Sequence, residues 1–273
     1  MAWIKGVLVA AAVFYLSVLI ALWALQGKLL YPAPQDRPAV PDGFSDIEII
    51  AGDGVKTRAF YREAKPDMPT VVHWHGNGET LAGSEYGTRA LAQAGYGLLL
   101  PEYRGYGGLD GKPGEEGFYR DGRAALQWLG AQGVTREQTV ISGYSIGSGT
   151  AVQMAVEHQP AALILNAPFR SLTNLVGEKF PWLPVSILLR DRFESRGKLA
   201  DFEKPVLMTH GEKDTLIPPS NTLALSEVIE DHEYYWFADL GHNDMYHDAV
   251  MARQLEWLAR KGLGPETDLG TAP

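Results

Sequence analysis

The sequence predicts an α/β domain whose mainly parallel sheet is covered by helices on both faces, preceded by one long apolar helix. Two observations support this fold class. Short runs rich in β-branched and aliphatic residues alternate with helix-length segments along most of the chain, which is the pattern of βαβ units. The chain also has 273 residues, of which 45% are hydrophobic and 21% charged, values that suit one globular domain with a sizeable core.

The composition excludes several classes of function. The formal net charge is -9 and no basic patch is present, so we do not expect nucleic acid as a partner. The chain has no cysteine, which excludes disulfides, thiolate zinc sites and a cysteine nucleophile. The absence of cysteine is compatible with either side of a membrane.

Residues 6–25 carry no charge and are long enough to cross a bilayer core of about 30 Å as a helix. Lys5 and Lys28 bracket this segment, and aromatic residues lie near its ends. A cleaved signal peptide is one alternative, but residues 24–27 form a poor cleavage site. A buried soluble helix would show a polar face, and this segment shows none. We therefore expect residues 1–30 to be a transmembrane anchor, with the following domain outside the cytoplasm.

The rest of the chain divides into a connector, a domain and a tail. Four prolines make residues 31–44 a stiff connector. The domain is expected over 45–263, followed by a flexible tail over 264–273. The domain begins with a sequence pattern that is typical of a β-hairpin. The predicted strands are 46–50, 55–61, 70–75, 97–101, 138–142, 162–165, 206–209 and 234–237. The predicted helices are 80–93, 120–132, 146–158, 223–229 and 249–260.

Residues 169–200 interrupt the alternation of strands and helices. This stretch is too apolar for a solvated loop, with a run of hydrophobic residues over 180–189. We interpret it as a small helical cap that supplies walls of a substrate pocket. An ordinary packed excursion of the chain is the alternative.

The sequence 139–149 predicts a strand, a sharp turn and a helix. The turn contains Gly143-Tyr144-Ser145-Ile146-Gly147, which would expose the Ser145 hydroxyl above the edge of the sheet. Glycines flank the serine because a side chain at either place would collide with neighbouring backbone. Serine alone is a poor nucleophile, so the pattern also predicts a histidine base and an acid that orients it.

Candidates for the acid and the base follow two later strands. Asp214 comes after the strand that ends at Thr209, and His242 follows the strand that ends at Phe237. The carboxyl ends of parallel strands meet at one edge of a sheet, so both side chains are expected near Ser145. The chain order serine, aspartate, histidine is that of nucleophile-elbow enzymes. Glu212 is the rival acid, while Asp239 and Asp244 are expected to form local loop hydrogen bonds.

Acyl transfer also requires donors for a developing oxyanion. We expect the backbone N–H of Ile146, at the start of its helix, and the backbone N–H of Asn77, in the glycine-rich loop after a strand. His73 and His75 alternate on one strand, but no third ligand cluster accompanies them, so we expect neither a metal nor another cofactor.

Five motifs, found in order, resemble those of α/β-hydrolases. They are 75–78 (HGNG), 102–107 (EYRGYG), 143–147 (GYSIG), 210–214 (HGEKD) and 241–244 (GHND). The chain is most similar to the membrane-anchored Bem46-like branch, which is related to serine aminopeptidase-like and depalmitoylating hydrolases. The resemblance covers about residues 31–260. It implies a serine hydrolase with Ser145, Asp214 and His242 as its triad.

From these observations we expect cleavage of an ester or thioester bond, with an amide as a further option, on an amphiphilic or acyl substrate. The anchor would hold the protein in a bacterial inner membrane. The side chains expected to bind substrate are Tyr103, Tyr144, Phe169 and Trp182. For the loop that contains Tyr103, a glycine-rich turn with packed tyrosines is the alternative. A catalytically silent binding protein and an acyltransferase are the alternative functions.

Overall fold

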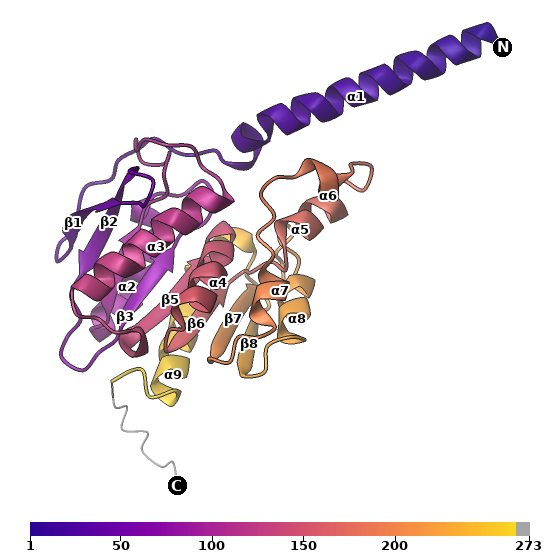
Figure 1. The fold of residues 1–273 in the computed structure, drawn as a ribbon. Coiled ribbons are helices and arrows are strands. Elements are labelled where there is room, and N and C mark those ends of the chain that lie inside the picture. The colour runs from indigo at the N-terminus through magenta and orange to yellow at the C-terminus, as the bar shows by residue number, and fades with distance from the viewer. Residues whose placement is uncertain (266–273) are drawn as a thin grey trace.

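The structure is a computed structural model that describes residues 1–265. Within these residues, eight strands form one sheet in the order β1-β2-β4-β3-β5-β6-β7-β8 (Figure 1). The strands are β1 (Ser45–Ile50), β2 (Lys56–Arg62), β3 (Thr70–Trp74), β4 (Gly97–Pro101), β5 (Thr139–Tyr144), β6 (Ala162–Asn166), β7 (Val206–Gly211) and β8 (His232–Phe237). Strands β3 to β8 run parallel, while β2 pairs antiparallel with both β1 and β4. The predicted α/β fold with a mainly parallel sheet is thus confirmed.

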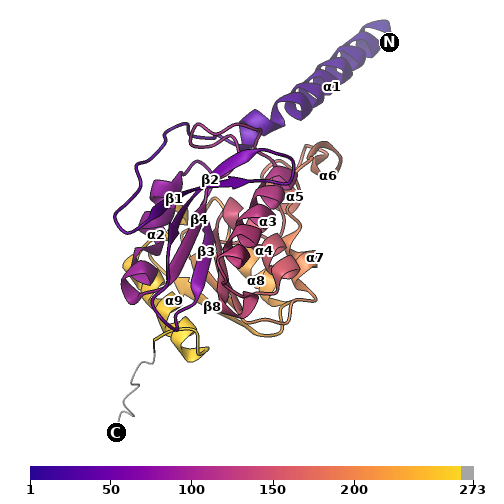
Figure 2. The same ribbon diagram turned by 60° about the vertical axis from the view of Figure 1, so that its left-hand side comes forward.

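Figure 2 shows helices on both faces of the sheet and α1 projecting away from the domain. The described residues form nine α-helices. They are α1 (Ala2–Leu30), α2 (Leu81–Ala94), α3 (Glu115–Ala131), α4 (Ile146–His158), α5 (Leu172–Lys179), α6 (Val185–Leu188), α7 (Ser195–Leu199), α8 (Ser220–Ser226) and α9 (Asp248–Arg260). Single 3₁₀ turns lie at Arg136–Gln138 and His242–Asp244. Of the helices described, only α1 is long and apolar enough to cross a membrane, by length and composition.

Successive residues of the central strands pack into two separate hydrophobic cores. On β5, for example, Val140 packs in the cluster beneath α2 and α9, whereas Ile141 packs in the larger cluster beneath α3 and α4. This alternation follows from the two-residue period of a strand. Both faces are covered, so every residue of β3 to β7 is buried, and the sheet provides a rigid base for the loops at its carboxyl edge.

Two helices begin three or more residues earlier than the sequence pattern predicted. Helix α3 starts at Glu115, because Phe118 is buried and two glutamates favour the first turn. Helix α8 starts at Ser220, since Pro219 supplies the fixed backbone angle that suits a helix start. Most of the predicted tail, 266–273, lies outside the described residues.

The connector 31–44 runs along the surface of the domain instead of hanging free. The carbonyl of Pro34 accepts a hydrogen bond from the N–H of Gly107 at 2.8 Å, and the carbonyl of Pro38 accepts one from Arg58 at 2.9 Å. The cap segment, 169–200, folds into the short helices α5, α6 and α7. The buried ring of Phe193 packs against Phe118 and Phe169, which attaches this segment to the main core.

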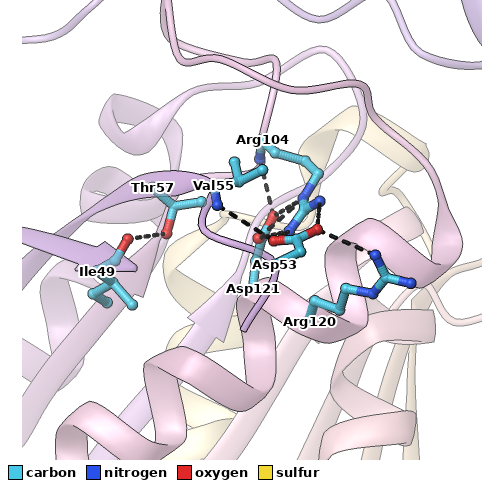
Figure 3. Close-up of polar contacts among 7 residues, drawn as sticks. All are labelled: Ile49, Asp53, Val55, Thr57, Arg104, Arg120 and Asp121. Carbon is cyan, nitrogen blue, oxygen red and sulfur yellow. Dashed lines mark hydrogen bonds and ion pairs between the residues drawn. The ribbon is translucent and has the colours of Figure 1, made fainter. Parts of the chain in front are cut away.

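A buried arginine joins the first hairpin to the parallel part of the sheet (Figure 3). Arg104 follows β4 and has 6% of its side chain exposed. Its guanidinium donates at 2.7 Å to Asp121 on α3 and at 2.7 Å to Asp53 in the turn between β1 and β2. Asp53 also accepts a bond from Arg120 at 3.2 Å. The Arg104 side chain therefore has a structural role in this network.

We predict that Arg104→Ala lowers the free energy of unfolding by about 3–5 kcal/mol, because it removes the cation that pairs with the buried Asp121 carboxylate and leaves only the backbone N–H of residue 104 as a donor. Urea denaturation followed by circular dichroism measures this loss. Arg123→Ala is the matched control: it breaks an ion pair with Glu157 whose side chains are 45% and 35% exposed, and it should cost less than about 1 kcal/mol. Equal losses in the two variants would contradict the prediction.

Candidate active site

Ser145 occupies the strained turn between β5 and α4. Its φ of 53° lies in the left-handed region that serine rarely adopts. A β-carbon at Gly143 would collide with the carbonyl of Gly147, and one at Gly147 would collide with the carbonyls of Trp74 and His75. The two glycines therefore allow α4 to begin directly against the end of β3, and the turn directs the serine away from the sheet.

Ser145, His242 and Asp214 lie in one hydrogen-bonded chain. The Ser145 Oγ is 2.9 Å from His242 Nε2, and His242 Nδ1 is 2.6 Å from Asp214 Oδ2. Each residue reaches this place from the carboxyl end of a different strand, namely β5, β8 and β7. A histidine held between a carboxylate and a hydroxyl can accept the hydroxyl proton.

The Asp214 carboxylate is held in its charged form. Burial alone would raise its pKa, but hydrogen bonds from His210, His242 and the N–H of Ile217 outweigh this effect and keep the pKa below its ordinary value. Its second oxygen accepts the N–H groups of Leu216 at 2.9 Å and Ile217 at 2.8 Å. The carboxylate is therefore fixed in both orientation and charge.

The rival acids lie elsewhere. Glu212 is exposed. Asp239 pairs with Lys213 at 2.8 Å, and Asp244 accepts the N–H of Gly241 at 2.7 Å. Of the two aspartates, Asp244 makes the local loop contact expected of it, whereas the partner of Asp239 lies in the loop after β7. In the described structure the His242 ring bonds to Asp214.

The two expected oxyanion donors lie on adjacent segments. The N–H of Ile146 is at the first position of α4, and the N–H of Asn77 lies in the loop 75–78 after β3; within residues 1–265 neither donates a hydrogen bond. The Asn77 side chain is fixed, since it donates to the carbonyl of Leu30 at 2.6 Å and accepts from Tyr106 at 2.7 Å. Both N–H groups are thus available to a ligand oxygen.

A buried ion pair supports the loop 75–78 from below. His75 Nε2 lies 2.7 Å from Glu102 Oε1, and His75 Nδ1 lies 2.8 Å from the carbonyl of Gly76. Both nitrogens face acceptors, so only the doubly protonated imidazolium satisfies both contacts. Burial would lower the pKa of His75, but the charge and hydrogen bond of Glu102 and the Gly76 carbonyl raise it above the ordinary 6.5.

The four expected substrate-binding side chains have different surroundings. Tyr103 is 1% exposed and donates to the carbonyl of His75 at 3.0 Å, so it supports the loop 75–78 from within the core. Phe169 is also buried, at 2% exposure, and packs on Phe193. Tyr144 stacks on His242 and donates to its carbonyl at 2.6 Å. Only Trp182, with 56% of its surface exposed, is open to solvent.

Sequence reasoning did not assign roles to several residues that hold the site. Glu79 accepts the N–H of Gly76 at 3.3 Å and the hydroxyl of Tyr246 at 2.8 Å, and Glu102 holds His75. Glu102 follows directly after β4 at the active edge of the sheet, so its position could have identified it. Glu79 has no such signal, because its partner Tyr246 is far away in the sequence.

We predict that Glu102→Gln destabilises the protein by about 3–5 kcal/mol near pH 5 and by less near pH 9. The folded protein holds the His75 proton more tightly than the unfolded chain does. The ion pair therefore contributes fully below the ordinary histidine pKa, and its contribution is lost as the pH rises through the raised value. Chemical denaturation at both pH values measures the difference.

His73→Gln is a control for which the loss of stability should change with pH in the opposite direction. Burial lowers the pKa of His73 to about 3, so this residue is neutral in the folded protein but takes up a proton in the unfolded chain as the pH falls. Replacing it should cost more near pH 9 than near pH 5. The same pH trend in both variants would contradict the assignment of His75 as a cation.

Comparison with known proteins identifies the family. The family described as "Serine aminopeptidase, S33" matches residues 65–195. An uncharacterized protein of Mycobacterium tuberculosis is 34% identical over 238 residues, or 84% of each chain. Protein bem46 of Schizosaccharomyces pombe is 28% identical over 82% of each chain. The solved esterase Pf2001 of Pyrococcus furiosus has the same fold, with a TM-score of 0.66 and 20% identity over 84% of this chain and 98% of its own. This chain is a member of the α/β-hydrolase family and belongs to its Bem46-like branch.

Proposed function

We propose that the protein is a serine hydrolase that cleaves ester or thioester bonds through an acyl-enzyme intermediate. The observation that carries the proposal is the hydrogen-bonded chain from Ser145 Oγ through His242 to Asp214. Support also comes from the strained backbone at Ser145, since strain of this kind is maintained where the surrounding structure requires it.

In the proposed acylation step, Ser145 Oγ attacks the carbonyl carbon of the substrate while His242 Nε2 takes its proton. The carbonyl oxygen becomes an oxyanion, which accepts hydrogen bonds from the N–H groups of Asn77 and Ile146. Asp214 stabilises the imidazolium that forms on His242. This imidazolium then protonates the leaving alcohol or thiol as the bond to the acyl carbon breaks.

Deacylation repeats the same steps with water as the nucleophile. His242 takes a proton from water, the hydroxide adds to the acyl carbon, and the oxyanion again lies between the two N–H groups. When the intermediate collapses, the proton returns to Ser145 Oγ and a carboxylic acid leaves. The ionised Asp214 keeps the imidazole in the orientation that both steps require.

We further propose that α1 is a single-pass anchor and that the substrate is amphiphilic and met at the membrane surface. Support comes from the length and apolar character of α1 and from the apolar cap segment next to it. Equal hydrolysis of short and long acyl esters by the full-length and anchor-deleted proteins would contradict this part of the proposal.

Ser145→Ala is expected to abolish covalent labelling by a fluorophosphonate probe and to reduce ester hydrolysis by about 10³-fold or more. The reason is that alanine lacks the Oγ that would attack both the substrate and the probe. Gel fluorescence of the labelled protein and steady-state kinetics measure both effects. A folded wild-type protein that does not react, or labelling that persists in the variant, would refute the proposal.

Asp214→Asn is expected to lower kcat by about 10³–10⁴-fold, because the imidazole loses the carboxylate that orients it and balances its charge. Glu212→Gln is the matched control. It changes an exposed acid two residues away and should leave kcat within about twofold of the wild type. A larger loss in Glu212→Gln than in Asp214→Asn would assign the acid role to Glu212.

A further inference from the structure

A cavity of about 350 Å³ lies between the end of α1 and the cap segment. We call it the anchor–cap pocket. Its volume falls within the range of small-molecule sites. One wall comes from α1, through Leu22, Leu29 and Leu30, and the other from the cap segment, through residues that include Val176, Leu183 and Leu188. Figure 1 shows α5 and α6 beside the end of α1 from which the domain begins.

Gln26 is the single amide side chain in the lining of this pocket, and it has no free polar group to offer a ligand. Gln26 is 8% exposed, and both ends of its side-chain amide are hydrogen-bonded. Its Nε2 donates to the carbonyls of Trp23 at 2.9 Å and Leu188 at 3.2 Å, while its Oε1 accepts the N–H of Arg190 at 2.9 Å. The remaining lining residues are all hydrophobic, so the pocket suits a hydrocarbon chain.

The cap segment extends along α1 to the depth of the proposed membrane span. Arg190 lies 5.0 Å from the ring centre of Trp23, an arrangement expected at the surface of a bilayer. Tyr15, about 12 Å further along the helix axis, donates to the carbonyl of Trp182 at 2.9 Å. The neighbouring Ile187 has 84% of its surface exposed. With α1 across the bilayer, this part of the cap segment contacts the lipid chains.

The inner end of the pocket adjoins the loop 75–78. Leu30 lines the pocket, and its carbonyl accepts the bond from the side chain of Asn77, whose N–H is a proposed oxyanion donor. Tyr31, the next residue, donates to Asp191 of the cap segment at 2.7 Å. The anchor, the cap segment and the loop 75–78 therefore meet at one point beside the proposed reaction centre.

We infer that the anchor–cap pocket binds the aliphatic chain of a membrane-resident acyl substrate, which enters from the lipid leaflet, and that α1 itself forms one wall of this site. The inference rests on the proposed function. It assigns to the anchor a direct part in recognising the acyl chain. Chain-length preference then depends on residues of α1 as well as on residues of the cap segment.

The test uses the full-length protein in lipid nanodiscs, with one variant for each wall. Leu29→Trp fills the pocket from α1, and Leu183→Trp fills it from the cap segment. Each buried methylene contributes roughly fourfold to binding. The ratio of kcat/KM for the dodecanoyl ester to that for the butanoyl ester should therefore fall about tenfold or more. Leu223→Trp, on the exposed face of α8, should keep the wild-type ratio.

Fluorophosphonate labelling of each variant verifies that the protein is folded and that Ser145 is reactive. Wild-type ratios in both reactive pocket variants would overturn the inference, while Ser145-dependent hydrolysis would leave the proposed function intact. Because Leu29 and Leu183 lie on different elements, misfolding of one variant leaves the other to decide. If this kcat/KM ratio falls as much in Leu223→Trp as in the pocket variants, the inference is also overturned.

A binding measurement separates failure of the inference from failure of the proposed function. Dodecanoic acid carrying a photoreactive diazirine should label peptides from 22–30 and 176–189 in the wild type, and far less in Leu183→Trp. This result would support the pocket even in a protein that hydrolyses no ester. Labelling that is spread over the chain, or equal in the two proteins, would overturn the inference.

Discussion

The strand-to-helix turn at Ser145 is the constraint on which the rest of the site depends. Its positive φ is maintained because α4 packs directly on the ends of β3 and β5, a contact that Gly143 and Gly147 make possible. The same close approach brings the loop 75–78 beside the start of α4. A single contact between backbones therefore positions the serine and the two candidate oxyanion donors relative to one another, and a shift of α4 would disturb all of them together.

Two histidines close to this turn differ in the protonation states that their hydrogen-bond partners allow. His75 lies between a carboxylate and a carbonyl, both of which only accept, so the ring must keep both protons. His242 lies between a carboxylate and the hydroxyl of Ser145, which can either donate or accept. The environment of His242 thus accommodates its neutral and its protonated form. A proton acceptor in catalysis requires that freedom, whereas a structural cation must not have it.

Local patterns predicted the sheet and the residues that meet above it, because Ser145, Asp214 and His242 each follow a strand closely. The alternation of strands and helices alone brings such residues to one edge. Tyr103 follows a strand in the same way but lies in the core, since the two-residue period ends with the strand and does not determine where a loop side chain points. The contacts of Gln26 with Leu188 and Arg190 join positions more than 160 residues apart, and no spacing rule relates them.

The contacts of the connector and of α1 change how the anchor is understood. The prolines of the segment after α1 predict a stiff connector, and the structure adds direct bonds at its start, from Tyr31 to Asp191 and from Asn77 to the carbonyl of Leu30. These bonds join the end of α1 to the cap segment and to the loop 75–78 at once. If α1 tilts in a bilayer, the domain must follow it, because these bonds hold the cap segment and the loop 75–78 to the end of α1. Under the proposal, the anchor would set the height at which an acyl chain meets the serine, so membrane attachment and substrate recognition would be two consequences of the same helix.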